Sequence, residues 1–227
     1  MLKLGLGLSL SNIKNMGAWS PDDESKLEAW YKKGAGIVLN GSDVSTWRDS
    51  SANSRDMAQA TATEQPAYDA SGEYLTFVSA DTNNLQTTSQ ISISDEFTIG
   101  IKFYPTAFNN TIIADNTTAN EFFKLTSDDR IAVKIDGSTK NMDLDGTDVF
   151  GDDYIVLTRN SSNLMTLYRN GSAQSATQTL PGTTDIDCIG VRKTDVNPYA
   201  GRIYEIQIYS ASNATLISNV NDYLSKL

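Results

Sequence analysis

The side chains of this chain limit the chemistry that it could perform. None of its 227 residues is histidine, which excludes Ser-His-Asp and Cys-His nucleophile systems, histidine-ligated zinc and histidine acid–base chemistry. The one cysteine, Cys188, excludes an intrachain disulfide and a thiolate cluster, and its apolar neighbours predict a buried side chain. Carboxylates, hydroxyls and amides remain. They suit calcium binding, carboxylate-based glycosidase chemistry, or recognition and assembly without catalysis.

The charge of the chain narrows the choice of partners. It has 18 Lys and Arg against 28 Asp and Glu, a formal net charge of −10. We expect no nucleic-acid partner, because attraction to phosphates needs the opposite sign. No apolar run reaches the length of about 18 residues that a membrane-spanning helix needs, so we expect no membrane partner either.

The first residues alternate strictly between leucine and small or polar residues. This period of two is a strand pattern, and glycines interrupt the stretch in a way that is unusual for a secretion signal. The strand could pair with the chain's own sheet or add to the sheet edge of a partner, and an exposed apolar face would also favour homo-oligomers. The candidate attachment residues are Leu2, Leu4, Leu6, Leu8 and Leu10.

Two helices are predicted, one near each end. Ser20 as N-cap, Pro21 at the first position and three acidic residues after it predict a helix that runs to Lys33 and stops at Gly34. Asn213 predicts the N-cap of a second helix. Its apolar stripe consists of Leu216, Val220, Leu224 and Leu227.

Between about residues 37 and 210 the pattern is one of short strands and turns. Apolar residues alternate with polar or small ones over 97–103, 131–135 and 202–209, and Asp136-Gly137 and Asn170-Gly171 predict tight hairpins. Many short strands with helices only at the ends predict an all-β fold, an antiparallel two-sheet jelly-roll sandwich with short peripheral helices near both termini. The simplest domain division is an N-terminal extension over 1–20 and one domain over 21–227.

An ordered set of motifs resembles the laminin-G-like, concanavalin A-like lectin/glucanase family. The segments Leu27–Tyr31 and Val44–Asn53 are similar to its opening motifs, Leu167–Gly171 to its "lyvNG" segment, and Gly201–Ile206 to its "GrIaEi" strand. The resemblance implies a two-sheet jelly roll. The family includes glycan-binding modules, adhesion domains, some glycosidases and many structural proteins of tailed-phage virions.

The residues do not match the catalytic pattern of the glycosidases in this family. The resemblance implies that an enzyme would carry two glutamates on one strand, spaced E-x-D-x-x-E or E-x-D-x-E. Asp185 and Asp187 alternate but include no glutamate, and Glu205 is the only acid on its strand. We therefore expect no enzyme activity and no catalytic residue.

We expect no cofactor. Calcium is the open alternative, because the chain has acid-rich loops. Asp143, Asp145 and Asp148 partly resemble a calcium loop but lack the spaced bidentate glutamate, and Asp81 falls where some family members carry a metal or ligand loop. The alternative interpretation is solvated turns, in which Asp and Asn are the usual residues.

Glycan contact needs an aromatic platform with amide or carboxylate groups beside it. Trp47 stands in a family motif beside Val44, so we expect it in the core. The glycan-contact candidates are Trp19, Asn83, Asn84, Tyr104 and Tyr199.

Together these features give a leading hypothesis and an alternative. The leading one is a bacteriophage virion protein, a capsid-decoration, fibre or tail component located in the virion. Its lectin-like domain would face outward, with possible contact to host-surface glycan, and its partners would be other virion proteins. The alternative is a free carbohydrate-binding or adhesion module, which could depend on calcium.

Overall fold

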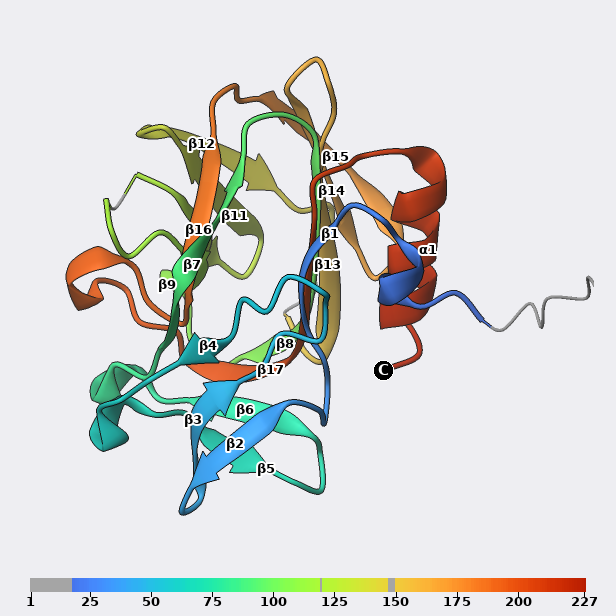
Figure 1. Cartoon of the computed structure of the whole chain (residues 1–227). Coiled ribbons are helices and arrows are strands. Elements are labelled where there is room, and N and C mark those ends of the chain that lie inside the picture. Colours follow the sequence, from blue (N-terminus) through green and yellow to red (C-terminus); the bar gives the residue numbers. More distant parts are fainter. Residues whose placement is uncertain (1–17, 119, 147–149) are drawn as a thin grey trace, which may run out of the picture.

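The computed structural model describes residues 18–118, 120–146 and 150–227 (Figure 1). The leucine-rich extension, including Leu2 to Leu10, lies outside these residues, as does Asp148. Within them the chain is an antiparallel all-β sandwich, as predicted, with one α-helix near the C-terminus.

The strands form two facing sheets, which are joined by a small annex (Figure 1). The first sheet has the order β1 (Leu27–Tyr31), β17 (Gly201–Tyr209), β8 (Phe97–Pro105), β13 (Asp153–Arg159), β14 (Leu164–Arg169), β15 (Ser172–Thr179). The second has the order β4 (Met57–Ala58), β7 (Leu85–Ile93), β16 (Thr184–Ile189), β9 (Asn110–Ala114), β10 (Phe122–Ser127), β11 (Arg130–Ile135), β12 (Ser138–Asp143). The annex consists of β2 (Ile37–Asn40), β3 (Asp43–Trp47), β5 (Ala67–Asp69) and β6 (Tyr74–Phe77), and β6 pairs with β17.

The predicted hairpins form where the turn dipeptides stand. Asp136 and Gly137 have φ of 47° and 77°, and Asn170 and Gly171 have φ of 48° and 81°. Two successive positive φ values are the geometry of a type I′ turn, whose twist matches that of the strands it joins. These turns fix the β11–β12 and β14–β15 pairings.

The core lies between the two sheets and is built from the apolar half of each alternating strand. Trp47 is fully buried there, with its ring 5.7 Å from that of Tyr31, as expected. Cys188 is buried, and burial raises the pKa of its thiol, which agrees with the prediction of an inert small side chain.

The C-terminal helix α1 (Ala214–Leu224) covers the outer face of the first sheet (Figure 1). Asn213 caps it as predicted, since its Oδ1 accepts a hydrogen bond from Leu216 N at 3.0 Å. The stripe of Leu216, Val220 and Leu224 is buried. No helix in the described part of the chain is long and apolar enough to cross a membrane.

The predicted N-terminal helix is wrong. A single 3₁₀ turn, η1 (Pro21–Asp23), follows Ser20, and the chain then enters strand β1. Leu27, Trp30 and Tyr31 have helical spacing, but β1 is covered on both sides. Tyr31 faces the core, whereas Trp30 stacks edge-on against Tyr223 of α1 at 6.2 Å between ring centroids. A strand buried on both faces loses its alternation, so periodicity could not distinguish it from a helix.

Candidate functional site

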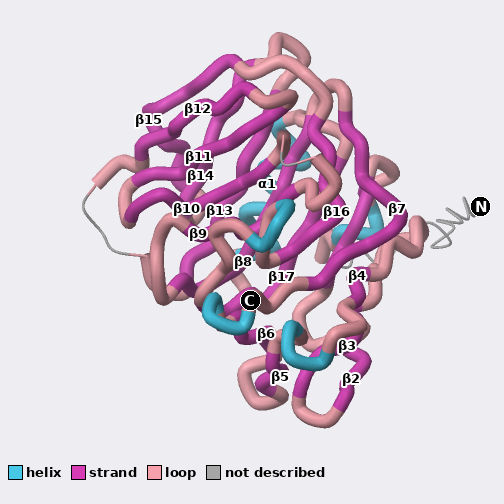
Figure 2. The backbone as a smooth tube through the Cα atoms, turned by 90° about the vertical axis from the view of Figure 1, so that its left-hand side faces the viewer, coloured by secondary structure: helices cyan, strands magenta, loops and turns pink. Residues whose placement is uncertain are grey.

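The two sheets differ in what covers their outer faces. Helix α1 lies on the first sheet, whereas the outer face of the second sheet, here called the open face, is turned away from it (Figure 1). Figure 2 views the molecule from this side, across β7, β16, β9, β10, β11 and β12. The open face is therefore the outer sheet surface that α1 does not cover.

One row of cross-strand neighbours crosses the open face. Successive pairings connect, in this order, Lys134 (β11), Phe122 (β10), Ala114 (β9), Cys188 (β16) and Gln86 (β7). Directly paired residues point to the same side of a sheet. Four interstrand spacings of about 4.8 Å make the row about 19 Å long.

At one end of this row three cations surround a phenylalanine. Lys124 Nζ lies 5.4 Å, Lys134 Nζ 6.0 Å and Arg192 Cζ 5.5 Å from the ring centroid of Phe122. The ring is 8% exposed and packs on Ala114 and Ala132. We call Lys124, Lys134 and Arg192 the basic cluster. The cations approach the ring as in cation–π contacts.

At the other end of the row lies a polar groove of about 450 Å³. Its walls come from β7, β16 and the loop after β9, and they consist of Gln86, Thr87, Thr88, Gln90, Asn116, Thr117 and Asp187. The Oδ1 atom of Asn116 is buried without a hydrogen-bond partner. Amides and hydroxyls of this kind match the hydroxyl groups of a sugar.

The acids beside the groove hold the loop after β9 in place. Asp187 accepts hydrogen bonds from Asn116 N at 2.6 Å and Thr117 Oγ1 at 2.8 Å, and Asp115 accepts one from Thr117 N at 2.6 Å. Burial raises the pKa of Asp187. These oxygens therefore already have donors from the protein.

Glu121 stands at the same loop and is 3% exposed. Its carboxylate accepts hydrogen bonds from Asp136 N at 3.0 Å and from Thr118 Oγ1 at 3.2 Å. Burial raises its pKa to about 7. This carboxyl group therefore changes charge close to neutral pH.

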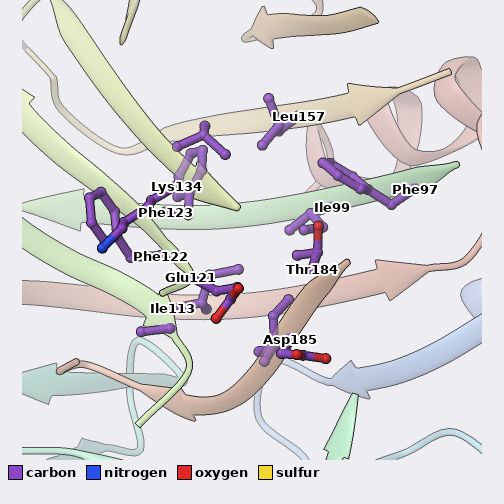
Figure 3. Close-up of a pocket in the computed structure, with 13 residues that line it drawn as sticks. Phe97, Ile99, Ile113, Glu121, Phe122, Phe123, Lys134, Leu157, Thr184 and Asp185 are labelled. Atoms are coloured by element: carbon purple, nitrogen blue, oxygen red, sulfur yellow. The ribbon is translucent and has the colours of Figure 1, made fainter. Parts of the chain in front are cut away.

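A second cavity lies next to Glu121, between the sheets (Figure 3). Phe97, Ile99 and Leu157 line it together with Glu121 and Thr184. Its volume of about 20 Å³ has room for about one water molecule. It is too small for a sugar, so the open face remains the candidate site.

The acids predicted to bind metal do not come together. Among the described residues there is no group of three or more Asp, Glu, Cys or His side chains arranged to hold an ion. Asp143 pairs with Arg130 at 2.5 Å, and Asp145 accepts a hydrogen bond from Ser175 N at 2.7 Å. Asp81 lies in a 3₁₀ turn and lines a separate cleft of about 310 Å³ with Asn83 and Asp43.

The predicted glycan-contact residues do not form one exposed site. Tyr199 is fully buried against Phe77, so its expected surface position is wrong. Asn83 and Asn84 are also buried and serve the fold: Asn83 accepts a hydrogen bond from Val78 N at 2.7 Å, and Asn84 donates to Thr82 O at 2.9 Å.

The other two candidates stay at the surface but away from the open face. Trp19 is half-buried against Tyr223 of α1, 6.1 Å between ring centroids. Tyr104, on β8, stacks on Arg202, whose Cζ lies 5.2 Å from its ring centroid. Both rings already pack against a neighbouring side chain of the first-sheet side.

The residues of the basic cluster were missed at the level of sequence. One signal was present, because Lys134 alternates with Val133 and Ile135 and must face away from the core. Arg192 follows β16 in an irregular loop. Such a loop has no periodic pattern from which the direction of the side chain could be predicted. The clustering depends on strand order, which only long-range pairing sets.

The comparisons with known proteins agree with this architecture. The model of the concanavalin A-like lectin/glucanases superfamily matches residues 69–214. No curated protein matches the chain.

Several solved structures share the fold. Domain 4 of AbnA, a GH43 extracellular arabinanase from Geobacillus stearothermophilus solved with arabinotriose, is 15% identical with a TM-score of 0.62, covering 88% of this chain and 98% of that one. The binding domain of Paraclostridial Mosquitocidal Protein 1 is 16% identical with a TM-score of 0.59, covering 90% and 53%. A Trypanosoma rangeli sialidase is 12% identical with a TM-score of 0.57, covering 89% and 33%.

The family match spans more than half of the chain, and the two-sheet architecture and the motif order point to the same family. The chain belongs to the concanavalin A-like lectin/glucanase superfamily.

Proposed function

We propose that this chain is a carbohydrate-binding, lectin-like domain and that its ligand lies on the open face of the second sheet. The observation that carries the proposal is the single cross-strand row that joins the basic cluster to the polar groove. The basic cluster at one end of the row and the amide and hydroxyl groups of the groove at the other lie about 19 Å apart, a length that suits a short oligosaccharide. The residues between them, Phe122, Ala114 and Cys188, are apolar and buried. The arabinotriose complex of the arabinanase domain supports a sugar as ligand.

We propose recognition without catalysis. The carboxylates beside the groove, Asp115 and Asp187, accept hydrogen bonds from the loop after β9. Glu205 lies on the first sheet and accepts hydrogen bonds from Trp30 Nε1 at 2.7 Å and Lys33 N at 3.1 Å. A glycosidase needs two carboxyl groups that flank the same bond, and these groups support the strand network instead.

A glycan array with the full chain tests this function, followed by titration of the best ligand. Gln90→Ala removes an exposed amide of the groove, and we expect about five- to tenfold weaker binding, as for one lost hydrogen bond. Gln178→Ala makes the same change on β15 of the first sheet and should leave affinity unchanged. An array on which the wild-type chain binds no glycan would refute the proposal.

We propose as a second function that residues 1–20 attach the domain to other subunits of a phage virion. Two points support it: the alternation of Leu2 to Leu10, a pattern that suits a strand added to a partner's sheet, and the resemblance to a family that includes virion proteins. Incorporation of a chain without residues 1–12 into particles tests it. Normal incorporation would contradict the attachment role and leave the glycan proposal standing.

A further inference from the structure

We propose that the basic cluster binds the carboxylate of an acidic sugar, so that the open face selects uronic- or sialic-acid-type residues over neutral ones. This inference rests on the proposed glycan function and names its ligand class. It is carried by the geometry around Phe122.

The first argument is the missing counter-charge. Among the described residues, no carboxylate lies within ion-pair distance of Lys124 or Arg192. Lys124 Nζ donates instead to the neutral amide oxygen of Asn109 at 3.0 Å. The chain has a net charge of −10, yet none of its described carboxylates pairs with these two cations.

The second argument is mutual repulsion. The side chains of Lys124 and Arg192 approach the same ring. Burial and the positive charge of Arg192 both lower the pKa of Lys124. Two like charges held at one apolar ring destabilise each other, and a bound anion removes that repulsion.

The third argument is an unused donor. The Nε–H of Arg192 is buried and finds no hydrogen-bond partner among the described residues, an arrangement that is costly unless a ligand completes it. A guanidinium presents a planar fork of donors that matches the two oxygens of a carboxylate. Arg192 is therefore the residue that we expect to contact the carboxylate, with Lys124 beside it.

The fourth argument is the direction of the ligand. Asp187 lies at the groove end of the row and would repel a carboxylate, whereas the basic cluster lies at the Phe122 end. This charge gradient orients an acidic sugar with its carboxylate at Phe122. The uncharged remainder then extends toward the amides of the groove.

The experiment compares ligands that differ only in charge. Isothermal titration at fixed salt would use tri-galacturonic acid and its methyl ester, and 3′-sialyllactose and lactose. We expect the wild-type chain to bind at least one acid about tenfold or more tightly than its neutral partner. Arg192→Gln should weaken binding of the acid about tenfold or more and so abolish this preference. Lys193→Gln, an exposed neighbour in the same loop, is the matched control and should retain the preference.

A second variant, Lys124→Gln, and a sulfated ligand complete the test. Lys124→Gln should reduce the preference several-fold, and it replaces Arg192→Gln if that variant does not fold by circular dichroism. Equal affinity for the acid and the neutral ligand in both pairs, measured on the wild-type chain, overturns the inference but leaves the glycan function intact. If none of the four ligands binds and the glycan array is empty, the function itself is refuted. Equally tight binding of 6-sulfogalactose oligosaccharides would overturn the assignment to a carboxylate.

Discussion

At the scale of single residues, the structure depends on ionisable groups that are buried with specific partners. Arg159 is fully buried and stacks over Phe97, with its Cζ 4.9 Å from the ring centroid. Its Nε donates to Asp95 O at 2.9 Å, its Nη1 to Gly182 O at 2.8 Å, and its Nη2 to Ile93 O at 3.3 Å. One side chain thus ties together the end of β7, the turn before β8 and the loop before β16.

We expect Arg159→Lys to lower the free energy of unfolding by about 2 to 4 kcal/mol, because an ammonium cannot reach all of these carbonyls and leaves buried acceptors unpaired. Urea denaturation measures the loss. The matched control Arg48→Lys, at an exposed position, should change stability by less than about 0.5 kcal/mol. A loss no larger than that of the control would show that the carbonyl contacts do not stabilise the fold.

Glu121 should give the stability of the protein a characteristic pH dependence. Its pKa in the folded chain is raised from 4.5 to about 7, so between these values the folded state binds more protons than the unfolded state. Stability therefore falls as pH rises through this window. Glu121→Gln should remove a decrease of roughly 1 to 3 kcal/mol. Urea unfolding at pH 4, 6 and 8 measures it, and parallel curves for the two proteins would contradict the assignment.

At the scale of elements, α1 packs closely on β8 because residue 100 of that strand is a glycine. A Cβ atom at Gly100 would lie 2.7 Å from Val220 Cγ1 and 2.9 Å from Leu224 Cδ1. The missing side chain lets the helix approach the sheet closely, and the stripe of Leu216, Val220 and Leu224 fills the contact.

We expect Gly100→Ala to lower the melting temperature, with a loss of about 1 to 3 kcal/mol from overpacking. Gly151→Ala is the control, since no atom of the described residues beyond its chain neighbours lies within 4 Å of a Cβ at that position. Combining Gly100→Ala with Val220→Ala should cost less than the sum of the two single changes, because the second change removes the clashing methyl group. Strict additivity in thermal unfolding would argue against this contact.

At the scale of the whole molecule, the two outer faces have different roles. Helix α1 covers the first sheet over β8 and β13, while the second sheet presents the open face with a local excess of positive charge on an acidic protein. The described residues supply both paired sheets and the core between them, and on this basis we expect residues 1–12 to be dispensable for the fold.

Deleting residues 1–12 should therefore leave the circular dichroism spectrum and the melting temperature within about 2 °C of those of the full chain. Light scattering of the same pair measures the homo-oligomer expected from the alternating leucines of the extension, which the deletion should abolish. A truncated chain that unfolds at markedly lower temperature would mean that the extension pairs with its own domain.

The sequence by itself determined the features whose physical cause is local. Alternation in β8 and β17, the type I′ turns at Asp136 and Asn170, and the Asn213 cap all follow from residues a few positions apart. The buried positions of Trp47 and Cys188 followed from their apolar neighbours.

Only the tertiary structure decided the features that depend on residues distant in the chain. Helical spacing around Trp30 gave way to strand β1, because pairing with β17 and cover on both faces stabilise that segment more than an isolated helix would. The basic cluster combines residues of β10, β11 and the loop after β16. Periodicity predicts which face of its own strand each side chain occupies. The order of the strands and the paths of the loops decide which side chains come into contact.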